Sequence, residues 1–115
     1  MKTTIGLMVV MLATCAFQCV NNPLPDESAL CTDTAWLQTI IKDAKQNTSK
    51  AEVIRYRYSD QTVYYINTCI DCADSMAQVY SCSGQVICQF GGIAGLNTCP
   101  DFEDKATNKK VIWRN

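Results

Sequence analysis

Eight cysteines within 115 residues constrain this chain more than any other feature of its sequence. Two of them, Cys15 and Cys19, lie near the N-terminus, and six lie between residues 31 and 99. An even set in a small exported chain is typical of a disulfide framework. The disulfide candidates are Cys31, Cys69, Cys72, Cys82, Cys88 and Cys99. Six cysteines can pair in about 15 ways, and the sequence does not choose among them.

The first residues have the pattern of a secretory signal peptide. Lys2 supplies a positive charge, residues 5–13 are apolar, and small residues follow. This run is too short to span a bilayer, so we expect no membrane span. Cleavage after Ala16 would give a secreted, extracellular protein. The alternative is a protein lipid-anchored at Cys15, because the preceding residues resemble a bacterial lipobox.

The chain divides into three parts. We expect a signal peptide over residues 1–16, a flexible tether over 17–29 and a single disulfide-stabilised domain over 30–115. The tether contains two prolines and few apolar residues. Cys19 lies in it and would be left over after the other six had paired. Cys19 could therefore join two copies of the chain in a disulfide-linked dimer.

An amphipathic helix is expected at the start of the domain. Thr32 or Asp33 can cap it by accepting hydrogen bonds from its first amides. The apolar residues that recur on one face are Trp36, Leu37, Ile40, Ile41 and Ala44. At this spacing Trp36 is expected to anchor the core. The helix should end near Gln46, and Asn47 begins an Asn-Thr-Ser sequon, a candidate N-glycosylation site.

Alternation and β-branched residues predict strands over 53–58, 61–68, 77–82 and 85–90. Ser59 and Asp60 suit the first tight turn, which would place Tyr56 opposite Val63. The fold class expected is α+β: one N-terminal helix packed on a small antiparallel β-meander of about four strands, stabilised by disulfides.

Two further elements are expected near the C-terminus. Residues 101–104 suit a short helix or turn, and residues 111–113 form a last apolar segment. We expect that segment to be an edge strand or a plug on the core.

The amino-acid composition excludes several classes of function. The chain has no histidine, which removes His-based triads and histidine metal ligands. Its ten basic and eleven acidic residues are scattered and give a net charge of −1. No basic patch indicates nucleic-acid binding. Asp101, Glu103 and Asp104 suit a solvated turn. We expect no enzyme activity, catalytic residue, cofactor or metal site.

Two cysteine sites nevertheless stay open as minor alternatives. Cys69 and Cys72 form a CxxC motif, so the chain could be a thiol redox protein. Such motifs usually open a helix after a strand, whereas this one lies in a meander, next to Asp71. A zinc site could join this pair to Cys82 and Cys88, although that second pair is loosely spaced and export favours disulfides.

A glycine-rich loop is the candidate partner-binding surface. Cys88 and Cys99 bracket it, and its central residues are Gly91, Gly92, Ile93, Ala94, Gly95 and Leu96. Braced loops on small secreted domains often bind partners. The simpler interpretation is that the glycines only let the chain turn.

An ordered series of short motifs covers about half of the chain that would remain after cleavage of the signal peptide. The motifs are Tyr56-Arg57-Tyr58, Val63-Tyr64-Tyr65-Ile66, Cys69, Gly84-Gln85-Val86-Ile87-Cys88, Gly91-Gly92, Cys99-Pro100-Asp101-Phe102 and Ile112-Trp113. In this order they resemble a family of small exported bacterial domains, many of them lipoproteins, whose function is unknown. Members often carry Asn-Gly where this chain has Ser59-Asp60. The resemblance implies export and a compact fold, and it implies no activity.

The function expected is that of a secreted, disulfide-rich, non-enzymatic domain with a binding or structural role and an unknown extracellular protein partner. The main alternative is an inhibitor of a secreted protease or hydrolase that acts through the Cys88–Cys99 loop. Thiol redox activity at Cys69 and Cys72 is the more distant alternative.

Overall fold

The computed structural model describes residues 30–115. The expected signal peptide, the tether, Cys15 and Cys19 lie outside the described residues. Among residues 30–115, no helix has both the length and the apolar character needed to cross a membrane.

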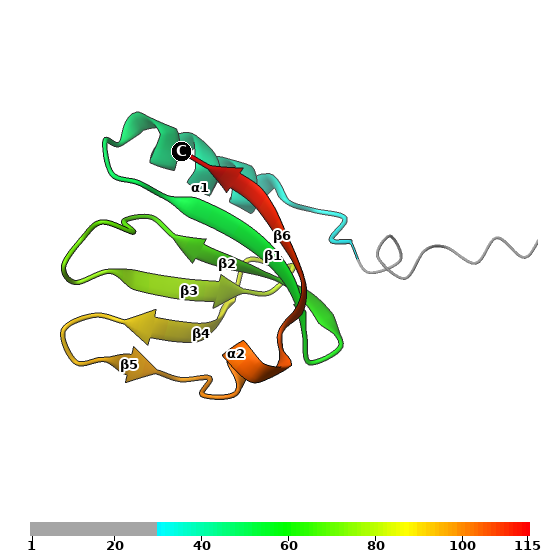
Figure 1. Cartoon of the computed structure of the whole chain (residues 1–115). Helices are drawn as coiled ribbons and strands as arrows, with labels where there is room; N and C mark the ends of the chain where they lie inside the picture. The colour runs from blue at the N-terminus through cyan, green and yellow to red at the C-terminus, as the bar shows by residue number, and fades with distance from the viewer. Residues whose placement is uncertain (1–29) are drawn as a thin grey trace, which may run out of the picture.

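The described chain forms a six-stranded antiparallel sheet with one long and one short helix. The elements are α1 (Ala35–Gln46), β1 (Glu52–Tyr58), β2 (Gln61–Asn67), β3 (Met76–Tyr80), β4 (Val86–Gly91), β5 (Leu96–Asn97), α2 (Phe102–Lys105) and β6 (Thr107–Arg114). The strand order is β5-β4-β3-β2-β1-β6. Figure 1 shows α1 along the top of the molecule and α2 near its lower end.

The helix-and-meander prediction holds in outline, but the expected number of strands was too low. The structure has six strands where about four were expected. The two additional strands are at the edges of the sheet. β5 has two residues and lies inside the predicted glycine loop, and β6 extends the predicted segment over residues 111–113 toward its N-terminal side. Four polar residues precede Val111 in β6, so hydrophobicity alone did not reveal its length.

The first hairpin is confirmed in detail. Tyr58 pairs with Gln61, and Tyr56 pairs with Val63, as the two-residue turn requires. Ser59 and Asp60 have φ angles of 50° and 59°. Positive φ at both turn positions matches the right-handed twist of the flanking strands.

The end of α1 at Gln46 is also confirmed. At its other end, the Ala35 amide donates to Asp33 Oδ1 at 3.1 Å. Trp36 packs against the buried cluster beneath the helix, and its indole N–H donates to the Cys82 carbonyl oxygen at 2.9 Å. A Cβ at Gly84 would lie 2.9 Å from the Trp36 ring, so the tight turn before β4 leaves room only for glycine there.

The buried residues separate into one cluster on each face of the sheet. The helix face, defined by the cluster under α1, contains Leu37, Ile41, Val53, Tyr64 and Ile66. The opposite face, which we call the open face, contains Val63, Val79, Cys88 and Phe102. The two clusters alternate along β2, because successive side chains of a strand point to opposite faces.

The prediction of an edge strand at the C-terminal end is confirmed. Within residues 30–115, β6 pairs with β1 and with no other strand, which places it at one edge of the six-stranded sheet. Arg114 and Glu52 form an ion pair with a 2.6 Å separation. The Ala51 amide donates to Asn115 Oδ1 at 2.7 Å. These contacts hold the end of β6 beside the start of β1.

Candidate functional site

Six cysteines form three disulfides. The pairs are Cys31–Cys82, Cys69–Cys72 and Cys88–Cys99, with Cα–Cα distances of 5.3, 5.3 and 5.6 Å. The first joins the segment before α1 to the β3–β4 turn. The third joins β4 to the segment before α2. The segment that leads into each helix is therefore joined by a disulfide, to a turn of the sheet before α1 and to strand β4 before α2.

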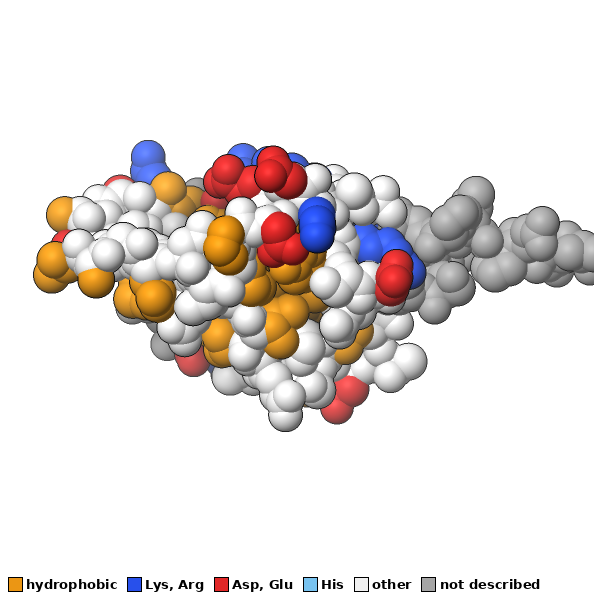
Figure 2. Space-filling view, turned by 90° about the horizontal axis from the view of Figure 1, so that it is seen from below, with side chains coloured by type: hydrophobic (Ala, Val, Ile, Leu, Met, Phe, Trp, Pro, Cys, Tyr) orange, Lys and Arg blue, Asp and Glu red, His pale blue; other side chains and the backbone are white. Residues whose placement is uncertain are grey.

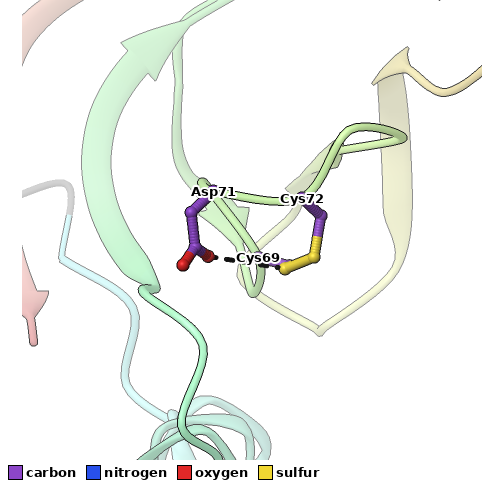
Figure 3. A group of neighbouring side chains, drawn as sticks. All are labelled: Cys69, Asp71 and Cys72. Atoms are coloured by element: carbon purple, nitrogen blue, oxygen red, sulfur yellow. Dashed lines mark hydrogen bonds between the residues drawn. A yellow bond between two sulfur atoms is a disulfide. The ribbon is translucent and has the colours of Figure 1, made fainter.

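The Cys69–Cys72 disulfide lies in the connection between β2 and β3. Figure 3 shows the Asp71 carboxylate turned toward the Cys69 sulfur, and Asp71 Oδ1 lies 3.6 Å from Cys69 Sγ. The three potential ligand atoms of this group lie within 4.8 Å of one another. Sulfurs bonded to each other are not thiolates, so the oxidised pair does not offer the ligands that a soft metal ion requires.

The four cysteines considered as zinc ligands are not gathered into one site. Cys82 is bonded to Cys31, and Cys88 is bonded to Cys99. Redox activity at Cys69 and Cys72 stays a prediction.

The predicted partner-binding residues form a tight turn between β4 and β5. The Gly95 amide donates to the Gly92 carbonyl oxygen at 3.1 Å, which places Ile93 and Ala94 at the tip. Ile93 is 89% exposed. Gly91 has φ +94°, and a Cβ there would collide with the Ser75 carbonyl oxygen, so no other residue fits. The turn is thus fixed at its base and presents an apolar side chain at its tip.

A groove on the open face adjoins this turn. Its volume is about 600 Å³. We call it the aromatic groove, because its apolar lining is dominated by aromatic side chains. The apolar lining residues are Ile54, Tyr56, Tyr65, Phe90, Phe102 and Ala106. Gly91, Gly95 and Leu96 contribute one wall, so the predicted loop borders the groove.

Figure 2 views the molecule from below, the side on which α2 lies in Figure 1. Hydrophobic side chains gather near the middle of this face, and acidic and basic side chains lie beside them. This mixture of groups agrees with the composition of the groove, which has an apolar lining and charged residues at its rim.

The aromatic lining is organised around Phe102, the buried residue of α2. Its ring centroid lies 5.3 Å from that of Tyr56, 5.5 Å from that of Phe90 and 6.5 Å from that of Tyr65. These separations are those of contacting aromatic pairs. Phe102 is 5% exposed, whereas the other three are partly exposed and leave surface available to the groove.

The rim of the groove carries charge of both signs. Glu52, Glu103 and Lys109 line it. Burial, followed by the Glu52 carboxylate, raises the pKa of Tyr65 above its usual 10.0, and Glu103 adds a smaller contribution. Burial and then Glu52 also raise the pKa of Tyr56. The carboxylates therefore disfavour further negative charge at the two hydroxyl groups.

The acidic segment around α2 has a structural role as well as a place at the groove. Asp101 Oδ1 accepts a hydrogen bond from the Tyr58 hydroxyl at 2.8 Å, and Lys105 lies 3.3 Å from Asp101 Oδ2. The Tyr58 hydrogen bond is the main cause that lowers the pKa of Asp101. Glu103 lines the groove, whereas Asp104 is exposed outside it.

The candidate glycosylation residue Asn47 is exposed at the C-terminal end of α1. It borders a second, smaller groove of about 290 Å³ on the helix face. Its glycosylation stays a prediction.

Sequence reasoning missed the aromatic groove. Its lining comes from β1, β2, β4, β5, α2 and β6, which are far apart in the chain. One partial signal was present: Tyr56 and Tyr65 lie on the same face of the predicted hairpin. That hairpin could not show what would lie above the two rings.

The described residues form a small, mostly β domain with three disulfides and an apolar groove. The chain belongs to the family of the domain of unknown function DUF6970, which matches residues 38–115. The match begins within α1 and includes every residue that lines the groove. No similar protein was found among curated proteins or among solved structures.

Proposed function

We propose that this chain is an exported, non-enzymatic domain that binds an extracellular protein partner. The binding surface is the aromatic groove together with the neighbouring turn over residues 91–96. The observation that carries the proposal is the groove, whose volume of about 600 Å³ lies within the range of about 300–1,000 Å³ common for ligand sites. A few polar groups around an apolar lining are also typical of such sites.

Side chains beside the groove favour a protein over an isolated small molecule. Leu96 lines the groove and is 39% exposed, and Ile93, which is 89% exposed, extends the apolar surface beyond it. Aromatic residues are enriched in protein interfaces, and exposed apolar patches mark interaction sites. The Cys88–Cys99 disulfide braces this surface, which reduces the ordering cost of binding.

Export is supported by the N-terminal pattern and by the three disulfides, which persist in oxidising compartments. The mass of the protein purified from culture medium or from membranes tests this. We expect a soluble chain that begins at Phe17. A chain that retains the N-terminal leader in the cytoplasm with free thiols would contradict export, and a lipidated Cys15 would replace secretion by anchoring.

Site-directed cross-linking tests the binding surface. A photoreactive residue at Leu96 should give a discrete adduct in cells that naturally produce the chain. The matched control is Val86, which is 42% exposed and lies away from the groove. With the adduct partner purified, Leu96→Asp should weaken binding at least about tenfold and Val86→Asp should not. Equal adducts at both positions, or equal effects of both substitutions, would overturn the proposal.

Inhibition of a secreted hydrolase is the second candidate. The observation that favours it is Ile93, which is almost fully exposed at the tip of a disulfide-braced turn. The tight turn weighs against it for proteases, because a bound substrate chain is usually extended. A panel of secreted proteases and hydrolases that retains full activity with excess protein would remove this candidate.

A further inference from the structure

The aromatic groove combines two features that attract the same kind of ligand. Three partly exposed rings, those of Tyr56, Tyr65 and Phe90, line it. The face of an aromatic ring carries negative electrostatic potential and attracts cations within about 6 Å of its centroid. Two carboxylates, Glu52 and Glu103, stand at the rim of the same groove.

The two carboxylates differ in how they are held. Glu52 is 17% exposed and is fixed by its ion pair with Arg114. Glu103 is exposed on α2, so a ligand can approach it from solvent. The Lys109 ammonium group lines the groove too and opposes a cation. Glu103 is therefore the side chain expected to contribute most to charge selectivity, and Lys109 the one expected to limit it.

The Glu52 carboxylate makes negative charge less favourable at the two tyrosine hydroxyl groups of the groove. The pKa values of Tyr56 and Tyr65 are raised, first by burial and then by Glu52. Burial opposes a charge of either sign, whereas the Glu52 carboxylate opposes only an anion. A neutral apolar ligand would use the rings without using the carboxylates.

We infer that the groove receives a basic side chain, lysine or arginine, presented by the protein partner. The apolar stem would lie on the rings, and the charged end would reach the carboxylate of Glu103. This inference rests on the proposed function, because it names the group by which that partner is recognised. Long basic side chains combine these two parts, since their stems pack on apolar surface while their ends stay solvated.

Small analogues of side chains test the inference on the exported protein by NMR titration. The probes are n-butylammonium for lysine, n-propylguanidinium for arginine, n-butanol as the neutral analogue and n-butyrate as the anionic one. We expect shifts of the Tyr65 and Phe90 ring signals and binding of both cations about fivefold tighter than butanol. Butyrate should bind most weakly, and added salt should reduce the preference for cations.

Two substitutions, each with a matched control, identify the charges that cause the preference for cations. Glu103→Gln should weaken n-butylammonium binding about threefold and leave n-butanol unchanged. Asp104→Asn is its control, because Asp104 adjoins Glu103 in α2 but does not line the groove. Lys109→Gln should strengthen binding of the cation about twofold. Lys110→Gln, one residue further along β6, should have no effect.

A titration with a peptide tests whether the groove accepts a basic side chain that is part of a protein chain, and not only a free amine. Acetyl-Ala-Lys-Ala-amide should shift the same ring signals more than the norleucine analogue does. If butanol binds as well as butylammonium, or Glu103→Gln has no effect, the inference fails and the proposed function stands. If the peptide is excluded while the free amine binds, the inference fails as well. If no probe shifts the groove signals, the proposed function fails with it.

Discussion

The two faces of the sheet are covered by helices of very different size. On the helix face, the twelve residues of α1 place Leu37 and Ile41 over Val53, Tyr64 and Ile66. On the open face, the four residues of α2 contribute one buried side chain, Phe102. The first arrangement seals most of its cluster, whereas the second leaves a groove of about 600 Å³. The cluster under α1 is therefore the better covered of the two, and the open face keeps accessible apolar surface.

The largest expected effect is the loss of stability when the disulfide that joins the segment before α1 to the β3–β4 turn is removed. The double variant Cys31→Ser, Cys82→Ser opens a loop with a sequence separation of 51. Loop-closure entropy predicts a loss of about 4 kcal/mol in the free energy of unfolding. Removal of Cys69–Cys72, whose separation is 3, should cost about 1–2 kcal/mol. Urea denaturation of both variants measures this, and the reverse order would contradict the expected roles.

The next largest expected effect is the loss of stability caused by a cavity under α1. Leu37 is 2% exposed, so Leu37→Ala removes fully buried atoms. We expect a loss of about 3 kcal/mol by urea denaturation. The ring signals of the aromatic groove should keep their positions. Gln38→Ala, at an exposed neighbour on the same helix, should change stability by no more than about 0.5 kcal/mol. A cost below about 1 kcal/mol for Leu37→Ala would mean that the helix face does not dominate stability.

The helix face was also the part that the sequence predicted best. The apolar spacing of α1 and the alternation in β1 are local patterns. The first predicted the C-terminal end of α1 at Gln46, although the N-cap is Thr34 rather than Thr32 or Asp33, and the second predicted β1 to within one residue. Local patterns suffice there because one helix and one hairpin supply most of the cluster. The turn residues Ser59 and Asp60 then set the register of the hairpin.

The open face depends on contacts that local patterns do not contain. β5 is a strand only because Leu96 and Asn97 pair with β4. One contact on the helix face is also of this kind, because the disulfide between Cys31 and Cys82 joins residues 51 apart in the sequence and no spacing rule selects it. The groove needs Phe102 to reach the rings of β1 and β2. Each of these features appears only once the chain has folded.

A substitution in the groove should affect ligand binding more than stability, whereas Leu37→Ala should affect stability alone. Phe90 is partly exposed, so Phe90→Ala should cost only about 1 kcal/mol of stability. It removes one of the rings that line the groove, and we expect the shifts caused by n-butylammonium to fall by more than half. Urea denaturation and NMR titration of the same sample separate the two effects. A loss of stability equal to that of Leu37→Ala, with unchanged titration shifts, would assign Phe90 to the core.

The smallest expected effect concerns the contact that holds α2 on the open face. The Tyr58 hydroxyl donates to Asp101, lowers the pKa of that carboxyl below 3.8 and has its own pKa raised above 10.0. A lowered carboxyl pKa stabilises the fold above pH 3.8, and this contribution is lost as the pH falls through the folded value. A raised tyrosine pKa stabilises the fold below pH 10.0 and is lost as the pH rises through the folded value.

Tyr58→Phe should therefore bring the Asp101 titration, followed by carboxyl NMR signals, closer to its usual range. The acid-dependent loss of stability should become shallower, because the variant no longer gains as much from the ionised carboxylate. Lys105 stays beside Asp101 and keeps part of the shift. The helix face has no part in this contact, so signals from Leu37 and Ile41 should not move over the acid range. Joint movement of both sets would show that α1 and α2 respond as one unit.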